Sequence, residues 1–260
     1  QSGIISYREV AEKYQEVVAE RGGDFRFNAP VTGIRIVNGQ EIVVITPGEE
    51  IRCRCLVNCA GLYSDRIAAM TMPDLNVQIL PFRGEYYELV KEREHLVNHL
   101  IYPVPNPDFP FLGVHFTRMI EGGIEAGPNA VLAFQREGYS RWDVDGSELR
   151  ETLAYPGFRR IAARYWRTGL GEFQRSFSKR AFVRALRHLI PEVGMEDRRR
   201  GRCGVRAMAC DRDGNLVDDF LILERGNVIN VANAPSPAAT ASLAIGETVA
   251  ERVLTRVAPA

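Results

Sequence analysis

The amino-acid sequence predicts an α+β fold with a large share of short antiparallel strands. Turn pairs such as Asn38-Gly39 and Asp213-Gly214 separate short runs rich in β-branched and aromatic residues. Helical periodicity is found near the two ends, in one central block and in the short stretch "LYSDRIAAMT". With 260 residues the chain exceeds the commonest single domain, so one large unit or two interleaved units are expected.

The first third predicts a helix, a small meander, a buried strand and a second helix. Residues 6–20 are amphipathic, and Ser6 with Glu9 three residues later forms a capping box. Asn38-Gly39 predicts a hairpin between "TGIRIV" and "QEIVVIT", and Pro47-Gly48 the next turn. "CLVNCAG" is typical of a buried strand, and the helix "LYSDRIAAMT" follows it. Ser64 or Asp65 is the expected cap of that helix.

The middle of the chain, from Asn76, predicts an antiparallel sheet of about five strands. The expected strands are "VQILPFRGEYYELV", "HLIYPVP", "FPFLGVHFT", "GGIEAGPN" and "AVLAF", which Pro, Gly and Asn separate. Helices are then expected over 147–154, 157–168 and 173–190, the last ended by Pro191.

The last part of the chain predicts strands again, followed by a closing helix. "GVRAMACD", "DDFLILE" and "VINVAN" are the expected strands, and the helix is expected from Pro237. The residues just after Pro237, "AATAS", are all small. This indicates that another group approaches the backbone closely there; a well-packed core helix is the alternative.

Composition and charge exclude several classes of protein. Lys+Arg and Asp+Glu are equal at 33 each, so no net field recruits nucleic acid or a membrane surface. The run Arg198-Arg199-Arg200 is expected in a solvated loop. No apolar stretch reaches the roughly 18 residues of a transmembrane helix. The five cysteines lack a second Cys/His pair at zinc spacing, which favours no metal site and a reducing, cytoplasmic location.

The beginning of the chain lacks an initiator Met and a signal-peptide profile, and it enters a helix almost at once. No G-x-G-x-x-G follows a strand, since "GLGEFQ" at 169 lies between helices. Alone, this argues against a nucleotide-binding protein. The expectation is that the chain is a piece of something longer, whose glycine-rich motif lies upstream.

Five segments of the chain are informative as a set, and they occur in this order: "CLVNCAGLYSDRIA", "PFRGEYYEL", "LIYPVPNPDFPFLGVHFTRMIEGGIEAGPNAVLAFQREGY", "GVRAMACDRDGNLVDDFLI" and "NAPSPAATASLAIG". Together they resemble the FAD-dependent L-2-hydroxyglutarate oxidases and dehydrogenases of the glycine oxidase and D-amino acid oxidase superfamily. The resemblance implies the C-terminal portion of an FAD-dependent oxidoreductase fold: a partial FAD-binding domain at 1–75, a mainly antiparallel substrate domain at 76–195, and a segment returning to the FAD-binding domain at 196–260. It also implies that the chain starts after the motif holding the ADP half of FAD, so the isolated chain should bind FAD weakly or not at all.

The resemblance implies that the C-terminal segment wraps the isoalloxazine ring. Free N–H groups and the positive end of a helix dipole favour the negative charge that develops on a reduced flavin. The cofactor-binding residues implied are Ala60, Gly61, Asn233, Ala234, Pro235, Ser236, Ala238, Ala239 and Thr240.

Oxidising an α-hydroxy acid requires a base for the hydroxyl proton, and neutral imidazole suits this step. His95, His99 and His188 lie in polar or Arg-rich stretches and are expected at the surface. His115 lies in "FLGVHFT" and shares a strand face with Gly113 and Thr117. A lone strand histidine is usually structural; the resemblance favours His115 as the base.

A dicarboxylate substrate invites arginine, whose planar fork grips a carboxylate with two hydrogen bonds. Arg206 in "GVRAM" and Arg83 in "PFRGEYYEL" are the candidates, Arg206 with a catalytic role beside His115. A structural ion pair is the alternative for either arginine. Tyr87, Tyr102 and Thr117 are further candidates for substrate binding, and Lys179 and Arg180 are weaker ones for the distal carboxylate.

The function that the resemblance implies is FAD-dependent oxidation of L-2-hydroxyglutarate to 2-oxoglutarate by the intact protein. Electrons would pass to oxygen or to a membrane quinone. If the acceptor is a quinone, the protein would be cytoplasmic but in peripheral contact with the inner membrane. Two other readings stay open. One is an amine oxidase of the same superfamily acting on glycine or sarcosine, and the other is a non-catalytic binding or complementing chain.

Overall fold

The computed structural model describes residues 3–39, 41–104 and 113–257. The chain forms two compact units, the first from Gln1–Ile79 with Val217–Ala260 and the second from Leu80–Leu216. The limits expected from the sequence were 75/76 and 195/196. The second limit differs because the strand Arg198–Asp211 pairs inside the sheet of the second unit. The assignment of the two parts to cofactor and substrate stays a prediction.

A capped helix and a three-stranded meander open the first unit. Helix α1 (Tyr7–Glu20) begins after Ser6, whose side chain accepts a hydrogen bond from the backbone N–H of Glu9, as predicted. Strands β1 (Gly33–Val37), β2 (Glu41–Thr46) and β3 (Glu49–Cys53) form an antiparallel sheet in that order. The expected turn at Asn38-Gly39 is confirmed, with positive φ values of 51° and 73°.

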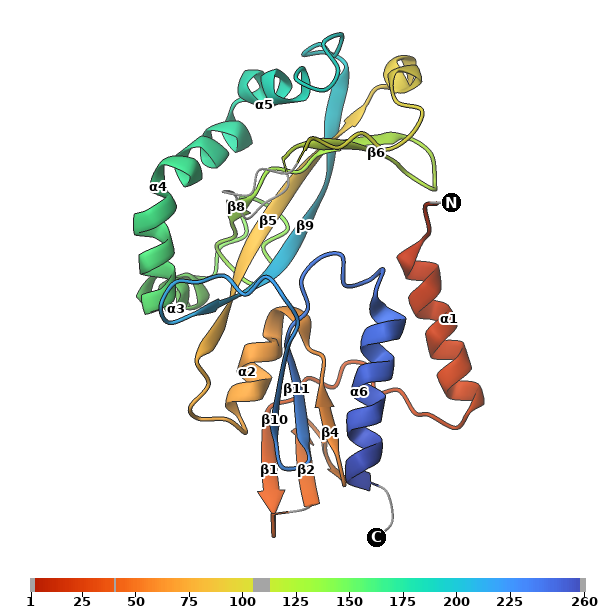
Figure 1. Ribbon diagram of the computed structural model, residues 1–260, viewed down its shortest axis with the longest axis vertical. Coiled ribbons are helices and arrows are strands. Elements are labelled where there is room, and N and C mark those ends of the chain that lie inside the picture. Colours follow the sequence, from red (N-terminus) through yellow and green to blue (C-terminus); the bar gives the residue numbers. More distant parts are fainter. Residues whose placement is uncertain (1–2, 40, 105–112, 258–260) are drawn as a thin grey trace. The chain divides into compact units, whose positions relative to one another are not determined.

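A second sheet in the first unit has the order β10-β11-β4. Strands β10 (Leu221–Arg225) and β11 (Val228–Asn233) are antiparallel, whereas β11 and β4 (Leu56–Asn58) are parallel. Every residue of β11 is buried, as a central strand requires. In Figure 1 the helices α2 (Ser64–Ala69) and α6 (Ser242–Val257) lie beside this sheet.

Two helix starts differ from the prediction. The cap of α2 is Tyr63, because the Ser64 hydroxyl donates to the Ala232 carbonyl and the Asp65 carboxylate accepts from the N–H of Ile79. The last helix begins at Ser242 and not at Pro237. Between Pro237 and Ser242 the chain forms tight turns. The N–H groups of Thr240, Ala241 and Ser242 each donate to the carbonyl three residues back.

The second unit contains a five-stranded sheet with the path β6-β7-β5-β8, in which β9 also pairs with β5. Figure 1 shows β5 and β9 running side by side as two long strands. The strands are β5 (Val77–Leu89), β6 (His115–Arg118), β7 (Ile124–Gly127), β8 (Val131–Leu132) and β9 (Arg198–Asp211).

The composition of this sheet corrects two expectations. The segment around Ile101 makes only an isolated bridge to Phe116, so β9 supplies the fifth strand. The basic run at Arg198 begins β9 and is not a loop, because the Arg198 guanidinium lies 3.8 Å from the centre of the Tyr87 ring. Residues 109–112 of the expected strand "FPFLGVHFT" lie outside the described residues.

Three helices follow the sheet, with limits that differ from the prediction. Helix α3 (Gly146–Ala154) agrees, but α4 (Pro156–Phe177) runs through the predicted break and kinks at Tyr165 instead. Helix α5 (Lys179–Leu186) begins where the Ser178 hydroxyl accepts from the N–H of Ala181. The main core lies between this helix and one face of the sheet, and its buried members are Tyr87, Leu89, Val97, Phe116, Ile124, Ala126, Phe182, Leu186, Ile190 and Val193.

Candidate functional site

His115 is the first residue of β6 and is 8% exposed. Its neighbour Phe116 belongs to the hydrophobic core, so strand alternation directs His115 and Thr117 to the opposite face of the sheet. Gly127 is the register partner of His115. A Cβ on Gly127 would lie 2.9 Å from the Glu85 carbonyl oxygen, so this glycine permits β5 to approach beside the imidazole.

The imidazole of His115 has one tautomer favoured by its surroundings. Nδ1 lies 3.1 Å from the carbonyl oxygen of Gly113, which can only accept, so Nδ1 carries the proton and donates it. Nε2 is therefore left with its lone pair. Burial lowers the pKa of His115 below its ordinary 6.5; the bond to Gly113 opposes this, and the charge of Arg206 adds to it. The side chain is thus a neutral base near pH 7.

Tyr102 and Arg206 act on this imidazole, and Tyr86 is joined to it through Arg206. The ring of Tyr102 stacks on it with the centroids 4.2 Å apart and the planes 18° apart. Arg206, half-buried in β9, is close enough for its charge to act on both His115 and Tyr86. Burial raises the pKa of the Tyr86 phenol, and the charge of Arg206 and a hydrogen bond with it lower that pKa in part. We call His115, Tyr102, Tyr86 and Arg206 the imidazole cluster.

Tyr86, which interacts with Arg206, was not among the candidates of the sequence analysis, which named its neighbour Tyr87. Tyr87 is 6% exposed, and its ring centre lies 4.6 Å from that of Phe182 in the core. Because successive strand residues face opposite sides, Tyr86 must then face the side of His115. The signal was present in the sequence as two adjacent tyrosines, but only the burial of one of them decides between the two.

Arg83 has the structural role that was the alternative in the sequence analysis. It is 2% exposed, and its Nε and Nη2 donate to Glu85 Oε1 at 3.3 and 3.2 Å. Its Nη1 donates to the carbonyl of Ser140 at 3.1 Å. An arginine whose charge is already paired inside the protein is a poor clamp for a substrate carboxylate. The structure therefore places Arg83 in an internal ion pair, and substrate binding by Arg83 stays an untested prediction.

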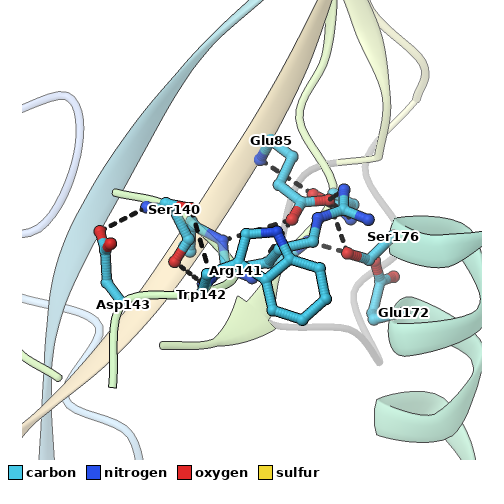
Figure 2. A network of polar contacts seen from close by, with 10 residues as sticks. Glu85, Ser140, Arg141, Trp142, Asp143, Glu172 and Ser176 are labelled. Carbon is cyan, nitrogen blue, oxygen red and sulfur yellow. Dashed lines mark hydrogen bonds and ion pairs between the residues drawn. The ribbon is translucent and has the colours of Figure 1, made fainter. Parts of the chain in front are cut away.

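The carboxylate of Glu85 is the centre of a buried network (Figure 2). Besides Arg83, it accepts from Ser176 Oγ at 2.7 Å and from Asn129 Nδ2 at 3.2 Å. Arg141 Nη2 lies 3.5 Å from its second oxygen. These partners come from β5, α4 and the loops after β7 and β8, so the network ties one edge of the sheet to α4. We call it the Glu85 network.

Lys179 and Arg180 lie in the first turn of α5 and are exposed. The contacts described for the imidazole cluster do not include either side chain, whereas the Lys179 carbonyl accepts a hydrogen bond from Arg198. The structure therefore does not bring them to the cluster. Thr117 lies on the face of His115, opposite Glu125 of β7.

In the first unit, β4 ends at Asn58, opposite Asn230 of the parallel strand β11, and β11 continues to Asn233. Asn58 donates to the Asn230 side chain at 3.0 Å and to the Ser64 carbonyl at 2.9 Å, and it accepts from the N–H of Ala60 at 3.0 Å. These bonds fix the turn that carries Ala60 and Gly61. Gly61 has a φ of +55°, and a Cβ built on it would meet no atom within 4 Å.

The second segment at this edge, Ala234–Thr240, follows directly after β11. The side chain of Asn233 donates to the carbonyls of Val217 and Asp219, both at 2.9 Å, so it holds the loop before β10. The next residues are small or proline: Ala234, Ser236, Ala239 and Thr240 are exposed, and Pro235 and Ala238 are half-buried. Open positions at the carboxyl ends of parallel strands are where α/β sheets usually bind ligands.

Comparison with known proteins identifies the class of protein that has this arrangement. The model of the DAO family, FAD dependent oxidoreductase, matches residues 1–252, and the chain belongs to this family.

Three of the similar relatives carry the name L-2-hydroxyglutarate dehydrogenase. L-2-hydroxyglutarate dehydrogenase of Indibacter alkaliphilus is 56% identical over 257 residues, covering 98% of this chain and 64% of the relative. The enzymes of that name from Escherichia coli K12 and, in mitochondria, Homo sapiens are each 42% identical and cover 99% and 98% of this chain. This chain spans 61% and 58% of their lengths.

Solved structures agree on the fold. L-α-glycerophosphate oxidase from Mycoplasma pneumoniae, with FAD bound, superimposes with a TM-score of 0.65 at 18% identity, covering 94% of this chain and 55% of the other. Glycine oxidase from Bacillus cereus gives 0.61 at 13% identity, covering 95% and 56%. At such identities the likeness concerns the fold alone. In the described part of the chain, none of the helices has the length and hydropathy to cross a bilayer.

Proposed function

We propose that the whole protein oxidises L-2-hydroxyglutarate to 2-oxoglutarate with FAD as its cofactor. The observation that carries the proposal is a neutral, tautomer-fixed imidazole beside a half-buried arginine, in a chain 56% identical to an L-2-hydroxyglutarate dehydrogenase. A base and a cation are the two groups that oxidation of a hydroxy acid requires. In this proposal the first unit serves the cofactor and the second unit serves the substrate.

The residues at the carboxyl ends of β4 and β11 fit a flat, partly anionic cofactor. Ala60, Gly61, Ala234, Ser236 and Ala239 are small and exposed, so a ring system can approach the backbone there. We infer that these residues, with Asn233, Pro235, Ala238 and Thr240, hold part of FAD, Asn233 through its backbone. Bound FAD supplies the acceptor for the hydride that leaves the α-carbon.

The imidazole cluster fits the substrate side of this reaction. His115 Nε2 takes the proton of the substrate hydroxyl, and the bond from Nδ1–H to Gly113 holds the ring while positive charge develops on it. Arg206 grips a carboxylate, with Tyr86, Tyr102 and Thr117 as further hydrogen-bond donors. As His115 becomes charged, the carboxylate held by Arg206 offsets the repulsion between the two cations.

The test is anaerobic reduction of the flavin in the whole protein loaded with FAD. We expect L-2-hydroxyglutarate to bleach the visible flavin band, and glycine, sarcosine and the D-enantiomer to leave it unchanged. Bleaching by an amine and not by the hydroxy acid would contradict the proposal. Reoxidation by air compared with a soluble quinone analogue then decides between the two electron acceptors that we consider, oxygen and a membrane quinone.

Replacing Arg206 by leucine is expected to lower kcat/KM for L-2-hydroxyglutarate about 10- to 100-fold, because a charge-assisted hydrogen bond contributes about 1.5–3 kcal/mol. Arg206→Lys should recover part of the loss but not the two-pronged grip. Arg206→Leu should also raise the pKa of His115 towards 6.5, because leucine carries no charge that repels the protonated imidazole. Arg202→Leu, on the same strand but exposed, is the matched control. Unchanged kinetics in Arg206→Leu would exclude the clamp.

A further inference from the structure

The helical segment of the second unit is strongly basic. Residues 156–187 contain nine Lys and Arg residues and one Glu, a formal charge of nine minus one, or +8, in a chain whose overall charge is zero. They form α4 and α5. Arg160 is paired with Asp213, while Arg164, Arg167, Arg180 and Arg184 are exposed. Such a concentration of positive charge attracts an anionic surface.

Large apolar side chains are exposed on the same helix. Trp166, Leu170 and Phe177 are 54%, 60% and 64% exposed. They follow the kink at Tyr165, and their spacing of four and seven residues puts them on one stripe of the regular part of α4. Arg167 lies 5.3 Å from the centre of the Trp166 ring, so charge and apolar surface are adjacent. Apolar side chains flanked by arginine are typical of helices that lie in a membrane interface.

An apolar cavity opens at this stripe. It has a volume of about 410 Å³ and lies between α4 and the sheet, with Phe82, Val131, Phe158 and Ile161 among its lining residues. Trp166 and Leu170 also line it, and because both are exposed the cavity reaches the surface beside them. A cavity of this size and polarity can take a segment of hydrocarbon chain.

We propose that the face formed by α4 and α5 binds an anionic lipid bilayer. Trp166, Leu170 and Phe177 enter the headgroup region, the arginines contact lipid phosphates, and the cavity accommodates part of an acyl chain. Nucleic acid would satisfy the charge but would leave the apolar stripe and the cavity in water. The proposal goes beyond the reaction proposed above and does not depend on its substrate.

The test measures binding of the chain to vesicles of phosphatidylglycerol and phosphatidylcholine by sedimentation. We expect binding that falls steeply with salt and is absent with phosphatidylcholine alone. Arg164→Glu/Arg167→Glu should weaken binding at least about tenfold, since each basic residue near an anionic surface contributes about 1 kcal/mol. Arg54→Glu/Arg200→Glu changes the total charge equally at exposed positions outside α4 and α5 and should bind like the parent chain.

The tryptophans give an independent readout, because Trp142 and Trp166 are the two in the chain. In Trp142→Phe the emission of Trp166 should shift to the blue on adding anionic vesicles. Leu170→Ser should weaken binding several-fold, and Ile120→Ser, at 53% exposure on another element, should not. Loss of binding in the Arg54/Arg200 variant, no emission shift, or binding to polyanions without binding to vesicles would each overturn the proposal.

Discussion

Replacing His115 by alanine is expected to lower kcat/KM of the whole protein for L-2-hydroxyglutarate by about 10²- to 10⁴-fold, the usual contribution of a positioned general base. The fall should appear mainly in kcat, because the proton is removed in the transition state and not on binding. Steady-state kinetics with a dye as electron acceptor measures both constants. Flavin content must be measured in parallel, so that loss of the cofactor is not mistaken for loss of the base.

The pH profile separates a base from a structural histidine. The base acts in its neutral form, and burial lowers the pKa of His115 below 6.5, so activity should be constant above that value and fall only at lower pH. In His115→Ala this acidic limb should disappear. Folding stability follows the same direction, because the unfolded imidazole binds a proton more readily than the folded one. The contribution of His115 is therefore complete above pH 6.5 and is lost as pH falls through the lowered pKa.

His188→Ala is the matched control for this substitution, because His188 is an exposed histidine next to α5 in the same unit. Its kinetics and pH profile should equal those of the parent protein. A His115→Ala protein that keeps flavin and turns over within threefold of the parent rate would remove His115 from the reaction. A profile that retains the acidic limb would assign that limb to another group.

Features set by local chemistry could be predicted from the sequence. The helix cap at Ser6, the turn at Asn38-Gly39 and the turn at Asp213-Gly214 depend on residues a few positions apart, and all three occur. Helix α4 was divided wrongly, because its glycines predict a break that packing of the helix on β8 and β9 overrides. The fifth strand was misplaced for a similar reason, since pairing of β9 with β5 joins residues over a hundred positions apart.

The candidate site depends more on such distant contacts than the fold does. His115, Tyr102 and Arg206 were predicted from the sequence, and the structure brings them together. The sequence could not decide which of Tyr86 and Tyr87 faces the imidazole. Strand alternation shows that the two side chains lie on opposite faces of the sheet, but not which face each one takes. Arg83 and Glu85 face the same side of one strand, which the sequence does show. It could not show that both side chains are buried and therefore pair with each other and not with water or a ligand.

Removing the carboxylate at the centre of the Glu85 network is expected to have the largest effect on stability. Glu85→Ala leaves the guanidinium of Arg83 at 2% exposure without its counter-charge, and breaking a buried pair in this way costs about 3–5 kcal/mol. Urea unfolding of the chain measures the loss. The exposed pair of Glu50 with Arg35, at 2.9 Å, is the control, and Glu50→Ala should cost less than about 1 kcal/mol.

The double variant Arg83→Met/Glu85→Gln tests whether the two charges depend on each other. Removing both leaves only Arg141, whose side chain is 17% exposed, without the Glu85 carboxylate. The double variant should therefore recover most of the stability lost in Glu85→Ala, and the single losses should not add. Additive losses, or a cost below about 1 kcal/mol for Glu85→Ala, would mean that the Arg83 charge is satisfied elsewhere.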